Sequence, residues 1–161
     1  MKKLAILILL LVFAATVSFA QTAKNGKIKV YNVTSDQMLT SNNMSSNYND
    51  CYWVETDETE GKVVLNFENI KHPSKPKAAF LVINIPEVQD ASSGTGVIVT
   101  IDGKKIGSIP NANANSFVYI NLDPSALTSQ KIKLILIGGG TDGLAISSKS
   151  SGFGPILQLE Y

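Results

Sequence analysis

Apolar and polar residues alternate along most of the chain after residue 27, and this period of two constrains the fold more than any other feature. Successive side chains of a β-strand point to opposite faces, so a strand with one buried face shows this alternation. The runs are rich in Val and Ile, which favour strands. They cover residues 28–31, 62–67, 79–85, 97–101, 117–122, 132–137 and 156–161. Their pattern predicts an all-β protein in which Val97, Val99 and Ile101 share one strand face.

The segments between the runs have the chemistry of turns. Asp102-Gly103 predicts a two-residue hairpin turn with positive φ at both positions. Asp123 followed by Pro124 predicts a capped single helical turn, and the glycine-rich residues 138–143 predict a loop before a further strand at 144–146. About nine or ten short strands joined in this way indicate a single jelly-roll-like antiparallel β-sandwich, with a closed barrel as the alternative.

Residues 1–20 have the features of an N-terminal signal peptide. Lys2 and Lys3 precede an apolar run from Leu4 to Val17, and Ser18 and Ala20 occupy the small-residue positions before a cleavage point. The run is shorter than the roughly 20 residues that cross a bilayer, which makes a retained anchor the weaker alternative. We expect a secreted, cell-surface or periplasmic protein in which residues 21–161 form one β-sandwich domain with no membrane span.

The charge and cysteine content of the chain limit the kinds of molecule that it can bind and the bonds that it can form. All 14 basic residues are lysines, and loss of the two in the expected signal leaves 12 against 13 acidic residues. A nearly neutral chain without arginine lacks the clustered positive charge that nucleic acids require, so no nucleic-acid partner is expected. The single cysteine, Cys51, cannot form a disulfide within its own chain and is expected to be a small buried residue.

The residue types needed for common catalytic sites are scarce. One histidine, His72, lies in a Pro- and Lys-rich segment expected to be solvated, and one His with one Cys cannot complete a zinc site. The acidic run with Asp57, Glu58 and Glu60 is expected to be a solvated turn, with a structural calcium site as the weaker alternative. We therefore expect no catalytic residues and no other cofactor; an enzyme would need two carboxylates of this run, or one with Asp50, to face each other across a cleft.

Aromatic and amide residues gather before and within one predicted strand. Sugar rings present apolar C–H faces to aromatic side chains, and their hydroxyls pair with amides and carboxylates. Tyr52 and Trp53 should point to opposite faces, so one of them is expected to be buried, and core packing is the alternative for this group. The predicted ligand-binding residues are Asn47, Tyr48, Asp50, Tyr52 and Trp53.

The order of these segments resembles the DNRLRE family, a carbohydrate-binding-module superfamily of bacterial and archaeal exported proteins. The similar segments are residues 33–41 with Asn47-Tyr48, residues 65–67 followed by 79–83, and residues 155–161. The chain has Asn49 where the family usually has glycine, and it lacks the arginines and glutamates typical of the family's later strands. The resemblance implies a jelly-roll-like sandwich with a non-catalytic binding role.

Two functions follow as hypotheses. The first is a secreted module that binds a polysaccharide or a cell-surface glycan. The alternative is a structural or adhesive protein of the envelope or matrix that self-associates through its own strands, because an exposed sheet edge can pair with another chain.

Overall fold

A computed structural model of the chain describes residues 27–39, 50–54, 62–88, 97–109, 112–138 and 143–161. These residues form eleven β-strands and two short 3-10 turns, with no α-helix among them. The strands are β1 (Ile28–Asn32), β2 (Ser35–Met38), β3 (Cys51–Val54), β4 (Lys62–Phe67), β5 (Ala78–Ile85), β6 (Ile98–Ile101), β7 (Lys104–Ser108), β8 (Ser116–Leu122), β9 (Ile132–Ile137), β10 (Leu144–Ser147) and β11 (Ile156–Glu160). The short turns are η1 (Pro124–Ala126) and η2 (Lys149–Ser151).

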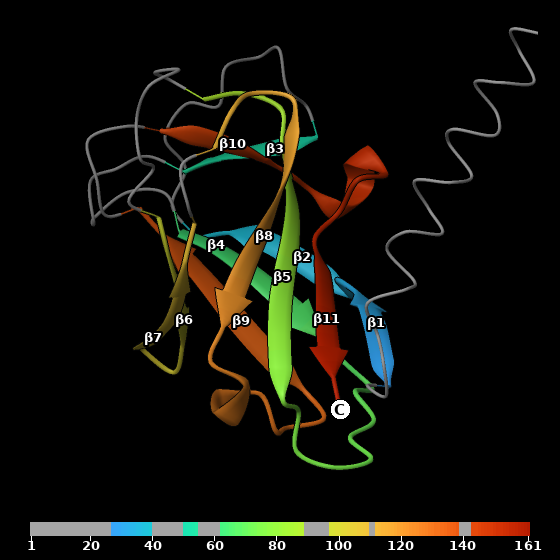
Figure 1. Ribbon diagram of the computed structural model, residues 1–161. Helices are drawn as coiled ribbons and strands as arrows, with labels where there is room; N and C mark the ends of the chain where they lie inside the picture. The colour runs from blue at the N-terminus through green and yellow to red at the C-terminus, as the bar shows by residue number, and fades with distance from the viewer. Residues whose placement is uncertain (1–26, 40–49, 55–61, 89–96, 110–111, 139–142) are drawn as a thin grey trace, which may run out of the picture.

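The strands form a β-sandwich, which confirms the predicted fold class (Figure 1). One sheet has four strands in the order β1-β11-β5-β8, and the other has five in the order β2-β4-β9-β6-β7. A two-stranded ribbon of β3 and β10 lies at one end of the sandwich (Figure 1). Every pairing is antiparallel. The chain crosses directly between the two sheets after β1, β4, β5, β7 and β8, and it returns from β9 to β11 by way of β10.

The alternating residues fill one hydrophobic core between the sheets. In β4 the side chains of Val63, Leu65 and Phe67 are fully buried, as the pattern predicts. In β5 and β8 the aliphatic residues at alternate positions are buried in the same way. Burial of this apolar surface is the main source of stability in a fold without disulfides.

One strand departs from the predicted pattern. The register of β6 against β7 shifts between Val99 and Thr100, which is a β-bulge. The extra residue is Ile106 of β7, because Gly107 pairs with Val99 and Lys105 pairs with Thr100. In β6, Thr100 is buried and Ile101 is half-buried. The Thr100 hydroxyl donates a hydrogen bond to the Ile135 carbonyl at 3.2 Å. Ile101 packs against the core that contains Val97 and Val99, in agreement with the predicted face, although it is only half-buried.

Two of the predicted turns are confirmed, and most of the predicted glycine-rich loop at residues 138–143 lies outside the described residues. Asp102 and Gly103 have φ angles of 48° and 79°, the left-handed values that a type I′ hairpin turn requires. Asp123 caps η1, and its carboxylate accepts hydrogen bonds from the backbone and the hydroxyl of Ser125.

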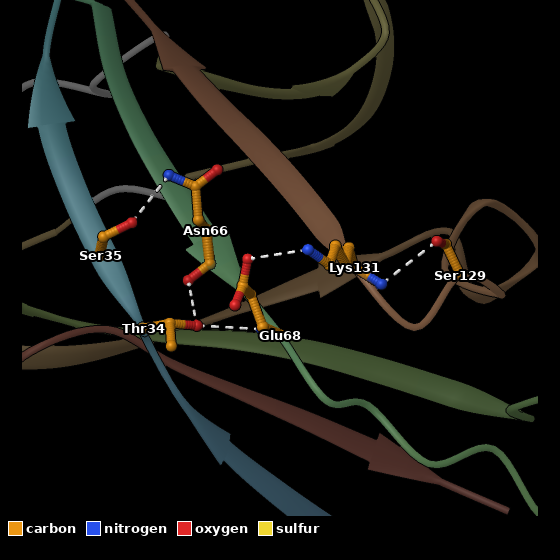
Figure 2. Close-up of polar contacts among 6 residues, drawn as sticks. All are labelled: Thr34, Ser35, Asn66, Glu68, Ser129 and Lys131. Atoms are coloured by element: carbon orange, nitrogen blue, oxygen red, sulfur yellow. Dashed lines mark hydrogen bonds and ion pairs between the residues drawn. The ribbon is translucent and has the colours of Figure 1, made fainter.

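The crossover from β1 to β2 is fixed by side-chain hydrogen bonds (Figure 2). The Thr34 hydroxyl donates to the Asn66 carbonyl at 3.0 Å and accepts from the Glu68 amide at 2.9 Å. The Asn66 amide donates to the Ser35 hydroxyl at 3.1 Å. These bonds hold the corner of the chain against the end of β4, so that β1 and β2 can belong to different sheets.

The described residues contain no helix with the length and apolar character needed to cross a membrane.

Candidate functional site

The predicted ligand-binding residues fall partly outside the described residues. Asn47 and Tyr48 lie outside them, and so do the weak calcium candidates, which are Asp57, Glu58 and Glu60. Within the described ranges, no group of three or more His, Cys, Asp or Glu side chains is arranged to hold a metal ion. Asp50, Tyr52 and Trp53 are described, and they lie beside or within β3.

Asp50 joins the ribbon to η2. Its carbonyl accepts a hydrogen bond from the Ser148 amide at 2.7 Å, and its carboxylate accepts one from the Ser150 hydroxyl at 2.8 Å. A carboxylate held in this way helps to shape the turn between β10 and β11.

Tyr52 and Trp53 are both half-buried, so the expectation that one of them is buried is wrong. The reason is the place of β3 at the end of the sandwich, where β10 is its one partner strand among the described residues. Tyr52 packs against the core, where burial, followed by the charge of Asp36 and a hydrogen bond to it, raises the pKa of the phenol. The Trp53 indole lies on Gly143 so closely that a Cβ at position 143 would be 2.6 Å from its Nε1.

The side chains of Cys51 and His72 contact neighbouring segments of the fold. Cys51 is buried, as predicted, with its sulfur 3.9 Å from the Ser147 hydroxyl, and burial raises the pKa of its thiol. His72 is half-buried rather than solvated. Its Nε2 lies 2.9 Å from the Ser129 carbonyl and its Nδ1 lies 3.0 Å from the Tyr161 hydroxyl. Both ring nitrogens thus hold neighbouring segments together.

The structure reveals a group of exposed aromatic residues that the sequence analysis missed. Phe117 and Tyr119 of β8 and Phe153, just before β11, expose 56%, 57% and 60% of their surface. The Phe117 and Phe153 ring centroids are 6.2 Å apart, with an angle of 64° between the ring planes. We call Phe117, Tyr119 and Phe153 the aromatic strip. The alternation in β8 contains the signal: Val118, Ile120 and Leu122 take the buried positions, so the aromatic residues between them must face outward.

The aromatic strip lies on the outer face of the four-stranded sheet, away from the core. The register places four rows of outward residues side by side across this sheet, and the row at one end is Ile28, Glu160 and Ala78. The other three rows are Asn32, Ile156, Val82 and Tyr119; Val30, Gln158, Phe80 and Asn121; and Asn84 with Phe117. We call the ten residues of these other three rows the outer face. None of them is charged, although 17% of the chain is Asp, Glu, Lys or Arg.

Two surface depressions flank the aromatic strip. One of about 390 Å³ is bordered by Phe117 and Phe153 together with Asn32 and Lys149. The other, of about 500 Å³, is bordered by Tyr119 and Asn121 together with Lys105. Concave sites lined by apolar groups with a few polar side chains are typical of ligand binding. The aromatic strip therefore connects two hollows that could hold parts of one elongated ligand.

The β-sandwich is shared with parts of larger glycoside hydrolases. The chain matches BuGH86 in complex with neoagarooctaose with a TM-score of 0.53 and 13% identity, over 84% of this chain and 19% of that chain. It also matches a β-porphyranase of glycoside hydrolase family 86 from the human gut bacterium Bacteroides plebeius, with a TM-score of 0.51 and 15% identity, over 83% and 20% of the two chains. What is shared is the fold. This chain spans about a fifth of the length of either neighbour.

No family model matches the chain, and no curated protein matches it in sequence. The resemblance to the DNRLRE family stays a prediction.

Proposed function

We propose that this protein is an exported, non-catalytic β-sandwich module that binds a polysaccharide or a cell-surface glycan, and that the aromatic strip is its binding surface. The exposure of Phe117, Tyr119 and Phe153 carries this proposal, because each ring leaves more than half of its surface in water. Exposed apolar patches of this kind usually mark an interaction site. Aromatic rings attract the C–H faces of sugars, and amide side chains pair with their hydroxyls.

The similar folds support the same class of ligand. Both neighbours are chains of carbohydrate-active enzymes, and one is in complex with an oligosaccharide. The aromatic strip is a better binding surface than Asp50, Tyr52 and Trp53, since these three residues already hold the ribbon, η2 and Gly143 in place.

Retention on a panel of insoluble and soluble polysaccharides, with and without calcium, tests the proposal. The purified protein should be retained by at least one polysaccharide. The double variant Phe117→Ala, Tyr119→Ala should lose this retention and keep its far-UV circular dichroism spectrum, because both side chains are exposed. Leu39→Ala is the matched control, because Leu39 is an exposed apolar residue of the five-stranded side of the molecule.

Two results would contradict the proposal. If the protein binds none of the polysaccharides, the proposed function loses its basis. Retention that survives in the double variant but is lost in Trp53→Ala would move the site to β3, where the sequence pattern predicts it.

A structural role through self-association is the second candidate, and the edge of the four-stranded sheet favours it. Edge strand β1 exposes Ile28 and Val30, and unprotected edges of this kind can pair with another chain. Sedimentation velocity over a range of protein concentrations separates the two functions. A monomer at all concentrations would contradict the structural role.

A further inference from the structure

We infer that the ligand of the aromatic strip is a single, uncharged glycan chain rather than an acidic polysaccharide or a crystalline surface. This inference rests on the proposed function and names the ligand class of the same surface.

The distribution of charge points to an uncharged ligand. Recognition of sulfates or carboxylates uses lysine or arginine donors, and the outer face has none. At one end of the strip, the Lys149 ammonium donates at 2.7 Å to the Thr34 carbonyl, which gives it a partner within the protein. At the other end, Lys105 borders the same depression as Asp123, whose negative charge offsets its own. The strip itself therefore carries no charge, and the lysines at its two ends lie beside a carbonyl acceptor or a carboxylate.

The polar side chains of the outer face suit hydroxyl groups. An amide both donates and accepts hydrogen bonds, and so does a sugar hydroxyl. Within the described part of the chain, Asn32, Asn121 and Gln158 have no side-chain hydrogen bond. Asn84 differs, because its amide donates to the Ser116 carbonyl at 3.3 Å and accepts from the Ser147 hydroxyl at 2.7 Å. Asn84 thus supports the base of the strip, and the other three amides are available to a ligand.

The geometry of the rings points to a single chain. Phe117 and Tyr119 are two residues apart on one face of β8, which separates them by about 7 Å, and the Phe153 ring centroid lies 6.2 Å from that of Phe117. A ligand that contacts all three rings must extend over several sugar units. The planes of Phe117 and Phe153 meet at 64°, so the two rings cannot lie flat on one crystal surface. A separate chain can rotate between successive units and stack on each ring in turn.

Affinity electrophoresis and titration calorimetry test this inference with four probes: a soluble neutral polysaccharide series, a sulfated galactan, a polyuronate and a crystalline polysaccharide. We expect binding to neutral chains to strengthen with chain length and to be the same at low and high salt. Phe117→Ala and Phe153→Ala should each weaken it by about tenfold, the loss expected for an aromatic contact and its buried area. Lys104→Ala, which removes an exposed positive charge outside both hollows, should leave binding unchanged.

The opposite outcomes are distinct. Binding confined to the sulfated or uronate polymers, and lost at high salt or in Lys105→Ala, would overturn the uncharged ligand and leave carbohydrate binding intact. Stronger retention on the crystalline polymer would overturn the single chain. Binding to none of the probes, together with a dimer that Phe117→Ala dissociates, would overturn both this inference and the proposed function.

Discussion

At the level of single residues, Thr34 fixes the point where the chain passes from one sheet to the other. Its hydroxyl makes two hydrogen bonds, to the Asn66 carbonyl and from the Glu68 amide (Figure 2). We expect Thr34→Val, which keeps the side-chain shape, to lower the free energy of unfolding by about 1 to 2 kcal/mol, because a hydrogen bond contributes roughly 0.5–1.5 kcal/mol net. Urea unfolding measures the change.

Lys131→Ala is the matched control for Thr34→Val. It removes an ion pair with Glu68 at 3.4 Å between exposed side chains. Pairs of this kind contribute about 1 kcal/mol or less. A loss in Lys131→Ala as large as that in Thr34→Val would contradict the assigned role of the Thr34 hydroxyl.

The raised pKa of Tyr161 predicts how the free energy of unfolding depends on pH. Burial, together with the neighbouring Tyr31 phenol, raises the pKa of Tyr161 to about 12. Because this value lies above that of an unfolded tyrosine, the stabilising contribution is complete below about pH 10 and is lost as pH rises toward about 12. The free energy of unfolding measured across this window should fall less steeply in Tyr161→Phe. Equal slopes in the two proteins would contradict the assignment.

At the level of elements, the alternation predicts strands well where each strand pairs on both sides. For β4 and β5 it gives both the strand and the buried face, since each has neighbours on two sides and covers the core. The β-bulge in β7 was not predictable, because it depends on the register with β6 rather than on local residue types. The half-burial of Tyr52 and Trp53 has a similar cause, since it depends on which strand pairs with β3.

The contact between β3 and the start of β10 can be tested through the only tryptophan in the chain. A Cβ at position 143 would lie 2.6–2.8 Å from atoms of the Trp53 indole, so the ring must move in Gly143→Ala. We expect the ring to move toward water and its fluorescence emission to shift to longer wavelength, with a loss of about 1–3 kcal/mol in stability. Ser108→Ala, at an exposed position of β7, should change neither quantity. An unchanged emission spectrum in Gly143→Ala would contradict this packing.

At the level of the whole molecule, the candidate site illustrates what a sequence pattern leaves open. Local composition indicates Tyr48, Tyr52 and Trp53 because they are close in sequence. The aromatic strip combines residues of β8 with Phe153, which is 34 positions beyond Tyr119 by sequence number, and only the order of strands in the sheet brings them together. The alternation predicts that Phe117 and Tyr119 point outward, but the order of strands in the sheet decides which residues lie beside them.

The ribbon of β3 and β10 raises the question of whether the molecule unfolds as one unit. The ribbon lies at the end of the sandwich, yet Val54, Leu144 and Ile146 are fully buried and belong to the same core as β4 and β5. Separating the ribbon would expose these three side chains, at a cost of about 1.5–3 kcal/mol for each one. We therefore expect Trp53 fluorescence, which reports on the ribbon, and far-UV circular dichroism, which reports on the sheets, to give coincident urea transitions. A Trp53 transition at lower urea would show that the ribbon opens first as a separate unit. The hydrogen bonds that Asp50 accepts from Ser148 and Ser150 would then be too weak to couple η2 to the sheets.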